Sequence, residues 1–364
     1  MKSISEFALS YVQQLVPYVP GKPIEELERE LGLSNIIKLA SNENPLGPSK
    51  KALAAIQASL PQLSLYPDGN GFNLKRALAK KHGIGEDQIT LGNGSNELLE
   101  LVARLFLSPG SEAVFSQHAF AIYAIVSQAA GAKLRSVSAL NFGHDLTAML
   151  ACVNENTRIV FIANPNNPTG TLLSQQAVES FLKALPVHCL CVLDEAYFEF
   201  VHSQENSDSV AWLATYPNLI ITRTFSKAYG LAGLRIGYGI SSVALADLLN
   251  RVRQPFNNNT LALVAAEAAL SDDEHLQATL KVNREGMLQL TEGFRRLGLT
   301  WIPSYGNFVA VDIKRPGLPV YEALLRKSVI VRPIGGYEMP NHLRVSIGTA
   351  TENDTFLTAL ADCL

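Results

Sequence analysis

One short stretch of the chain, from Thr224 to Arg235, carries a lysine, hydroxyl groups and an arginine. Its lysine, Lys227, comes soon after Leu219–Thr222, a β-branched run that reads as a buried strand. We therefore expect Lys227 on a loop at the carboxyl end of a strand, where open α/β sheets bind ligands. Ser226 and Arg235 add a hydroxyl and a fixed cation suited to phosphate. This combination predicts an amine nucleophile beside an anion site, and the alternative is a solvated loop lysine.

A second candidate for chemistry is the carboxylate of Asp194, which directly follows the apolar run Leu190–Leu193. A charge at the end of a buried strand is costly unless a cation pairs with it. The alternative is that Asp194 caps the turn that follows. The first interpretation predicts a carboxylate that faces a cationic partner in the site.

A glycine-rich turn, Gly92–Glu97, precedes a helical pattern that begins at Leu98. Free backbone N–H groups at a helix start, together with the Ser95 hydroxyl, make an anion site. A dinucleotide fingerprint is not present, because Glu97 stands where the last glycine of G-x-G-x-x-G belongs. The turn is either an anion-binding turn or an ordinary helix cap.

The composition is that of an enzyme-sized globular protein, with 364 residues, 47% hydrophobic and 17% charged. The formal net charge of −3 gives no sign of nucleic-acid binding. We expect no membrane span, because the longest apolar window, 113–132, is interrupted by polar residues. We expect no metal site either: His188, Cys189 and Cys191 lie on one strand, where neighbours face opposite sides. The first residues lack the pattern of a signal peptide, which predicts a cytoplasmic protein.

The elements that must position these groups are short apolar strands alternating with helical patterns. We expect strands at 88–91, 112–115, 158–163, 190–193 and 219–222, and helices at 50–59, 73–82, 243–252, 260–270 and 272–297. A Pro- and Asn-rich stretch at 254–260 marks a domain boundary, and residues up to 36 form an arm. The predicted division is 1–36, 37–256 and 257–364.

The run S-K-x-x-G-L-A-G-L-R around Lys227 resembles the Schiff-base lysine segment of fold-type I aminotransferases that use pyridoxal 5'-phosphate (PLP). Within them it is similar to the histidinol-phosphate aminotransferase branch, from about Ile37 to Gly348. N-P-T-G at Asn167–Gly170 supports the likeness. The resemblance implies a mainly parallel, doubly wound large domain plus a small α+β domain. It also implies that Lys227 binds PLP and shuttles the substrate proton, and that Asp194 keeps the pyridine nitrogen protonated.

Further cofactor contacts follow from the resemblance. The resemblance implies that Gly94, Ser95, Ser226 and Arg235 form a cup around the phosphate of PLP. It implies that Phe120 stacks on the PLP ring and that Asn167 and Tyr197 bind the ring oxygen. Thr224 is implied to supply a hydroxyl near the lysine. The tyrosine of Tyr-Pro, Tyr66, is implied to reach the phosphate of the other subunit. The active protein is therefore expected to be a homodimer.

Alternation in Leu343–Ile347 puts Arg344 on the face opposite the apolar residues. This arginine is either solvated or, as the resemblance implies, clamps the anionic group of the substrate. Arg332 resembles the second arginine of the branch, and Asn44 is placed near the substrate. Three aromatic residues, Tyr18, Tyr123 and Phe256, are candidates for contact with the substrate side chain.

The implied reaction transfers the amine of L-histidinol phosphate to 2-oxoglutarate, a step of histidine biosynthesis. Two arginines suit this pair, because one site must hold either a phosphate or a dicarboxylate. The alternatives on the same fold are an aromatic-amino-acid aminotransferase and a threonine-phosphate decarboxylase. A PLP-binding regulator would need a DNA-binding segment before Ile37, and no basic helix-turn-helix pattern is found there. A catalytically silent homologue is disfavoured because Lys227, Asp194 and Arg235 are all present.

Overall fold

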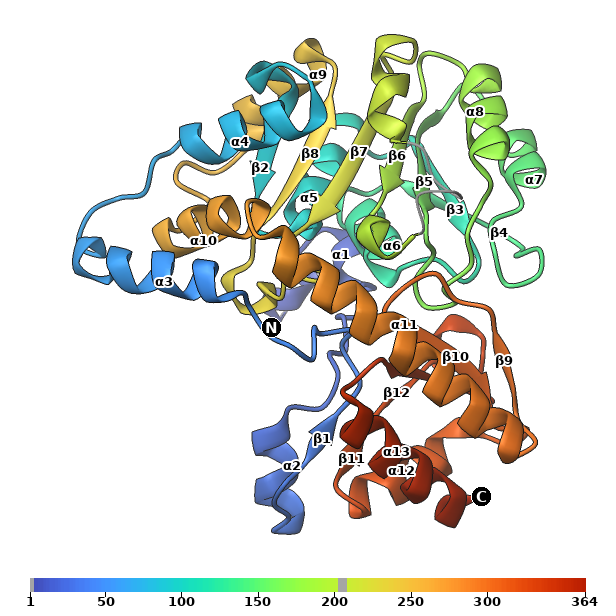
Figure 1. Cartoon of the computed structure of the whole chain (residues 1–364). Helices are drawn as coiled ribbons and strands as arrows, with labels where there is room; N and C mark the ends of the chain where they lie inside the picture. The colour runs from blue at the N-terminus through green and yellow to red at the C-terminus, as the bar shows by residue number, and fades with distance from the viewer. Residues whose placement is uncertain (1–2, 202–207) are drawn as a thin grey trace.

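A seven-stranded sheet forms the centre of the larger part of the molecule (Figure 1). The computed structural model describes residues 3–201 and 208–364. The strand order is β2-β8-β7-β6-β5-β3-β4, and β8 alone runs antiparallel to its neighbours. The strands are β2 Ile89–Gly92, β3 Glu112–Ser116, β4 Lys133–Val137, β5 Thr157–Ala163, β6 Leu190–Asp194, β7 Leu219–Thr224 and β8 Gly237–Ser241. Because β3 to β7 are parallel, their carboxyl ends meet at one edge of the sheet.

Helices cover both faces of this sheet, as a doubly wound fold requires. They are α3 Lys50–Ser59, α4 Phe72–His82, α5 Ser95–Phe106, α6 Ala121–Ala129, α7 Leu146–Ala151, α8 Gln175–Ala184, α9 Val243–Val252 and α10 Thr260–Leu270. Strand β6 shows how the sequence sorts the two cores. Cys191 and Leu193 pack with α4, α8 and α10, whereas Leu190 and Val192 pack with α5, α6 and α9. The near-continuous apolar strands therefore reflect burial on both faces.

A second, antiparallel sheet has the order β12-β13-β10-β9 and its own apolar core. Its elements are β9 Thr300–Ile302, β10 Phe308–Asp312, β12 Arg332–Pro333, β13 His342–Ser346, α11 Asp273–Arg296, α12 Gly317–Arg326 and α13 Ala350–Cys363. As the alternation predicts, Leu343 and Val345 of β13 face this core, and Arg344 faces away from it.

The N-terminal segment contacts both parts of the molecule. Strand β1, Ile37–Lys38, pairs in parallel with β11, Val329–Ile330, and α2, Ile24–Leu31, buries Leu27 against Ile330. The short helix α1, Ser10–Gln13, lies nearer the start of the chain. Its Tyr11 carbonyl accepts a hydrogen bond from Gln128 of α6.

The remaining regular elements are 3-10 turns. They are η1 Ile4–Phe7, η2 Leu60–Gln62, η3 Glu86–Gln88, η4 Phe198–Phe200, η5 Ser209–Ala214, η6 Ala232–Leu234 and η7 Gly335–Tyr337. Within the two described ranges, no helix is both long and apolar enough to cross a bilayer.

Most predicted elements are confirmed to within a few residues, among them α3, α9 and α10. One start was wrong: α5 begins at Ser95, not at Leu98, because Gly94 adopts a φ of 79° and lets the chain turn directly into the helix. The first residues of the predicted arm form two short elements, η1 and α1.

A buried ion pair joins the ends of β6 and β7. Arg223, only 1% exposed, donates from Nε to Glu195 at 2.9 Å and from Nη2 to Asp208 at 2.9 Å. Its guanidinium also lies 3.6 Å from the centre of the Phe198 ring. Burial raises the pKa of the Glu195 carboxyl, and the charge of Arg223 opposes that shift. The buried charges of Glu195 and Arg223 therefore offset each other, and Glu195 directly follows Asp194 in the sequence.

We expect Arg223→Met to lower the free energy of unfolding by about 3–5 kcal/mol, because Glu195 then loses its cation inside the protein. Urea titration followed by tryptophan fluorescence measures the change. The matched control is Arg251→Met, since Arg251 pairs with Asp247 at an exposed position. That variant should change stability by about 0.5 kcal/mol or less. Equal effects of the two substitutions would contradict the role assigned to burial.

Candidate active site

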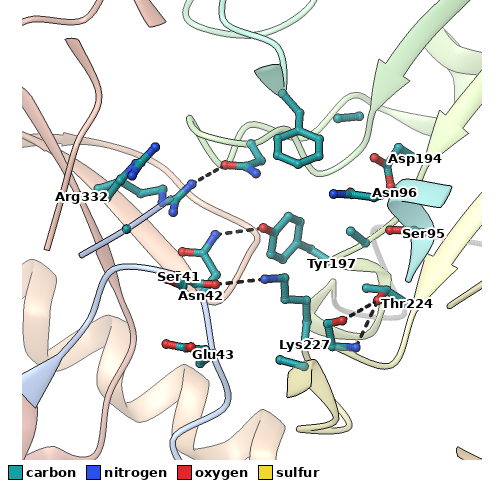
Figure 2. A pocket seen from close by; sticks show the side chains of 18 of the residues that line it. Ser41, Asn42, Glu43, Ser95, Asn96, Asp194, Tyr197, Thr224, Lys227 and Arg332 are labelled. Atoms are coloured by element: carbon teal, nitrogen blue, oxygen red, sulfur yellow. Dashed lines mark hydrogen bonds between the residues drawn. The ribbon is translucent and has the colours of Figure 1, made fainter. Parts of the chain in front are cut away.

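A cavity of about 260 Å³ opens at the carboxyl ends of β5, β6 and β7, beside β13 of the second sheet (Figure 2). Most of the predicted site residues line it. They are Tyr18, Ser95, Phe120, Tyr123, Asn167, Asp194, Tyr197, Thr224, Ser226, Lys227, Arg235, Arg332 and Arg344. The residues come from both sheets and from the N-terminal segment, so the fold brings together groups that are far apart in the sequence.

The amine of Lys227 projects into this cavity from the loop after β7. Its Nζ donates to the Ser41 carbonyl at 3.1 Å and lies 5.9 Å from the centre of the Tyr197 ring. Burial, and then the nearby charge of Arg344, lower the pKa of Lys227 to about 8. A lysine with that pKa is partly neutral near physiological pH, so it can act as a nucleophile or a base.

The local backbone leaves little freedom for the lysine loop. Gly230 has a φ of 69°, and a Cβ at this position would lie 2.2 Å from the carbonyl oxygen of Gly47. Only glycine fits there, which explains the glycine three residues after Lys227.

Asp194 is buried, 5% exposed, at the end of β6. Its carboxylate accepts hydrogen bonds from the Tyr123 hydroxyl at 2.8 Å and from Thr222 Oγ1 at 3.1 Å. In the described part of the chain no lysine, arginine or histidine forms an ion pair with it. Burial raises the pKa of Asp194, and the two hydroxyl donors counteract this. A cationic ligand group in the cavity would complete the site.

Tyr123 departs from the prediction of a substrate contact. It is fully buried, its hydroxyl donates to Asp194, and its ring stacks on Phe161 with 4.7 Å between centres. Because its single hydroxyl hydrogen is committed to the carboxylate, Tyr123 holds Asp194 in place instead of facing the substrate.

Another wall of the cavity is built to hold an anion. Ser95 opens the 12-residue helix α5, whose first N–H groups carry partial positive charge. Arg235 donates to Ser226 Oγ at 3.3 Å and to the carbonyl of Ala232 at 3.1 Å. A Cβ on Gly94 would lie 2.2 Å from Arg235 Nη2, so glycine is needed for the guanidinium to approach the turn. Together these groups form a cup of hydroxyls, amides and one cation.

Behind the cup, Thr224 organises the hydroxyls. Its Oγ1 accepts from the backbone N–H of Ser226 at 3.1 Å and lies 3.0 Å from Ser226 Oγ. The side chain of Ser226 is therefore held between Thr224 and Arg235, where it can serve an anion in the cup.

Arg344 supplies a buried cation from β13. It donates from Nη1 to Asn167 Oδ1 at 2.7 Å and from Nη2 to the Ala40 carbonyl at 2.7 Å. Its Nε is buried and has no hydrogen-bond partner in the described part of the chain. Burial lowers the pKa of Arg344. A positive charge with neutral partners and a free N–H is suited to an anionic ligand.

Arg332 lies beside the N-terminal segment at the edge of the cavity. It donates from Nη2 to the Val19 carbonyl at 2.6 Å and lies 5.8 Å from the centre of the Tyr18 ring. The second arginine thus joins the cavity and also fixes the stretch that carries Tyr18.

Sequence reasoning placed Asn44 near the substrate, but the structure puts another residue of the same stretch in the cavity. Asn44 is outside the lining, and its amide donates to the Ala228 carbonyl and to Thr279, each at 3.0 Å. Asn42 lines the cavity instead and donates to the Tyr197 hydroxyl at 2.9 Å. The run Ser-Asn-Glu-Asn-Pro offers two asparagines, and neither the spacing nor the prolines distinguish them.

Tyr66 and Phe256 lie outside the cavity of their own chain. Tyr66 is 83% exposed, and its ring stacks on Phe256 with 4.8 Å between centres. A substrate contact of Phe256 within one chain is therefore not supported.

The arrangement fits a flat ligand with a cationic ring nitrogen at one end and a phosphate at the other. Asp194 meets the first group with an otherwise uncompensated charge, and the cup around Ser226 and Arg235 meets the second. Lys227 and Arg344 remain available for a second ligand that carries an amine and an anion.

The sequence of residues 34–360 matches the family model described as aminotransferase class I and II. Histidinol-phosphate aminotransferase 2 of Pseudomonas aeruginosa is 60% identical over 355 residues, which cover 97% of this chain and 96% of the relative. The Pseudomonas fluorescens protein of the same name is 59% identical over the same shares.

Solved structures agree. Histidinol-phosphate aminotransferase from Sinorhizobium meliloti, in complex with pyridoxal-5'-phosphate, has a TM-score of 0.91 at 31% identity and covers 97% of this chain and 96% of its own. Aspartate aminotransferase from Thermus thermophilus with maleate covers 100% of both chains with a TM-score of 0.85, and its 21% identity supports the fold alone. The expected fold-type I architecture is confirmed, and the chain belongs to the class I and II aminotransferase family.

Proposed function

We propose that this aminotransferase uses PLP to transfer the amine of L-histidinol phosphate to 2-oxoglutarate, which gives imidazole acetol phosphate and L-glutamate in histidine biosynthesis. The observation that carries the proposal is a single cavity that joins Lys227, an anion cup and a buried Asp194 that has no ion pair among the described residues. The relatives that are 59% and 60% identical bear this enzyme name and support the choice of donor.

In this proposal PLP is held by residues already described. The cup of Gly94, Ser95, Ser226 and Arg235 binds its phosphate, and Asp194 pairs with its ring nitrogen. Tyr197 and Asn167 bind the ring oxygen, and Phe120 stacks on the ring. Bound PLP supplies an electron sink for the negative charge that develops at the substrate carbon.

The chain's own groups then handle the protons. Lys227 would take the proton from the substrate carbon and deliver it to the aldehyde carbon of the cofactor, for which a pKa of about 8 is well suited. Asp194 holds the ring nitrogen protonated, since a buried carboxylate is most stable beside a cation. Tyr123 and Thr222 keep that carboxylate aimed into the cavity.

Two arginines determine the substrate class. Arg344 binds the anion that each substrate presents, and Arg332 adds a second cation for a phosphate or for the distal carboxylate of 2-oxoglutarate. Tyr18, held against Arg332, bounds the space for the imidazole ring. An aromatic-amino-acid aminotransferase is the second candidate, because Tyr18 also suits a phenyl ring.

We propose the cytoplasm as the location, supported by four free cysteine thiols, which fit a reducing compartment.

We also propose that the boundary between the two domains lies at the start of α11, not at 256/257. The buried alanines of α10, Ala262, Ala265 and Ala266, pack in the core of the seven-stranded sheet.

The active form is proposed to be a homodimer in which Tyr66 reaches the cofactor phosphate of the other subunit. Support comes from the surface around Tyr66, which exposes several apolar side chains. Leu60, Leu63 and Leu65 are 42%, 56% and 69% exposed. A second copy of the chain would cover this patch.

The first prediction concerns Lys227. When PLP is added to apoprotein, the rate at which the absorbance of bound PLP develops should rise with pH and level off above about pH 8, because only the neutral amine attacks. An ordinary lysine, with a pKa of 10.5, would keep the rate rising to pH 10. Borohydride reduction and peptide mapping should find the label on Lys227. In the Lys227→Ala control PLP binds through the cup without a fixed label, and a label on any other lysine refutes the assignment.

A second prediction decides the substrate. Arg332→Ala should reduce kcat/KM for histidinol phosphate on the order of ten- to hundredfold, since a charged hydrogen bond is worth about 1.5–3 kcal/mol. Phenylalanine, which lacks the doubly charged phosphate, should be affected less. Arg326→Ala, at an exposed position of α12, is the matched control and should change neither value. If the unmodified enzyme prefers phenylalanine and Arg332→Ala affects both donors equally, the aromatic aminotransferase becomes the better assignment.

A third prediction tests the shared site. Tyr66→Ala and Lys227→Ala proteins are each expected to be nearly inactive, and mixing them should restore activity once subunits exchange. One of the two sites in a mixed dimer then carries neither defect. Mixing Lys227→Ala with Arg344→Ala is the control, because both residues line the cavity of one chain and no intact site can form. No gain from the Tyr66 pair after confirmed exchange would put Tyr66 in its own chain's site.

A further inference from the structure

The hydroxyl of Tyr197 has one hydrogen-bond partner in the described part of the chain, the amide of Asn42. Asn42 Nδ2 lies 2.9 Å from the Tyr197 oxygen, and an amide nitrogen can only donate. The phenol oxygen therefore accepts, and its own hydrogen remains free to point elsewhere. Both residues line the cavity, as Figure 2 shows.

The orientation of the Asn42 amide is determined by Ser346 on β13. Ser346 Oγ accepts from the backbone N–H of Asn42 at 2.8 Å, so its own hydrogen is available to donate. It donates to Asn42 Oδ1 at 3.1 Å. With the amide oxygen bound on that side, the NH₂ group faces Tyr197. The hydrogen bonds therefore run in one direction, from Ser346 through Asn42 to Tyr197.

The backbone conformation at Asn42 restricts which residues fit at this position. Its φ is 55°, a left-handed conformation that asparagine and glycine tolerate best. The side chain is 1% exposed, and the Asn42 carbonyl accepts from Asn307 at 3.0 Å. Glycine would also adopt this backbone conformation, so the conformation alone does not explain why the residue carries an amide side chain.

We propose that Asn42 and Ser346 are positioning residues that turn the hydroxyl hydrogen of Tyr197 into the cavity, so that Tyr197 donates to the ring oxygen of PLP. The inference rests on the proposed function, because it needs Tyr197 to face the cofactor. It adds what determines the direction of that hydrogen bond. Without Asn42, the phenol could accept from the ligand or rotate its hydrogen away.

The consequence is electrostatic. A ring oxygen that receives a hydrogen bond keeps less negative charge and holds a neighbouring proton less tightly. Other charges around Tyr197 are Arg344, Asp194 and Lys227, together with the phenol of Tyr337, and they act whichever way the hydroxyl points. A test must therefore separate the direction of the hydrogen bond from the effect of charge.

The experiment uses reconstituted holoenzyme and measures the pH midpoint at which the absorbance of bound PLP changes. Tyr197→Phe should raise the midpoint on the order of one pH unit, the equivalent of one lost hydrogen bond to a charged group. Asn42→Asp should raise it by a similar amount, because a carboxylate can only accept and would take the hydroxyl hydrogen of Tyr197. In the Tyr197→Phe background, Asn42→Asp should add a much smaller shift, which represents its charge alone.

Two controls keep the outcomes separate. Asn42→Gly preserves the left-handed backbone and removes the amide, so it should shift the midpoint in the same direction by less, with Tm and the Kd for PLP close to those of the unmodified enzyme. Equal shifts of Asn42→Asp with and without the Tyr197 hydroxyl, or no shift in Asn42→Gly, overturn the positioning role while leaving the proposed function intact. If Tyr197→Phe itself causes no shift, the contact between Tyr197 and the cofactor is refuted, and the inference falls with it.

Discussion

A negative charge buried at the end of a strand is the constraint on which this site depends. Asp194 accepts from two neutral donors, Tyr123 and Thr222, and forms no ion pair in the described ranges. Its neighbour Glu195 faces the opposite way and forms a buried ion pair with Arg223. The two adjacent carboxylates thus have different partners. Glu195 pairs with a cation of the protein, whereas Asp194 can pair with a cationic group of a ligand. The difference follows from the alternation of side chains at a strand end.

The stretch from Ala40 to Asn44 connects the parts that hold the ligand. Carbonyls of this stretch accept from Arg344 and from Lys227, and the Asn42 side chain joins Tyr197 to β13. The seven-stranded sheet supplies the cofactor side of the cavity, and the second sheet supplies Arg344 and Ser346. Because one short segment bonds to both, a displacement of either sheet would alter the lysine, the phenol and the arginine together.

Much of this could be predicted from the sequence, and the misses have physical reasons. Lys227, Asp194 and Arg235 follow strands or glycine turns whose patterns are local, so their neighbourhood can be read directly. The choice between Asn42 and Asn44 depends on a φ angle and on contacts with residues more than 300 positions away, which no local pattern contains. An aromatic residue such as Tyr123 is a candidate for substrate contact in the sequence, and only packing shows that its hydroxyl is already bound to Asp194.

The pairing of the N-terminal segment with β13 also has a consequence for the order of synthesis. Leu39 accepts a hydrogen bond from the backbone N–H of Ser346, and Asn42 bonds to the same serine, 304 positions later in the chain. A ribosome therefore makes Asn42 long before it makes Ser346. The large sheet can fold while the chain is still growing. The stretch from Ala40 to Asn44 can form its bonds with β13 only after Ser346 has emerged from the ribosome, although Tyr197 and Lys227 are made earlier.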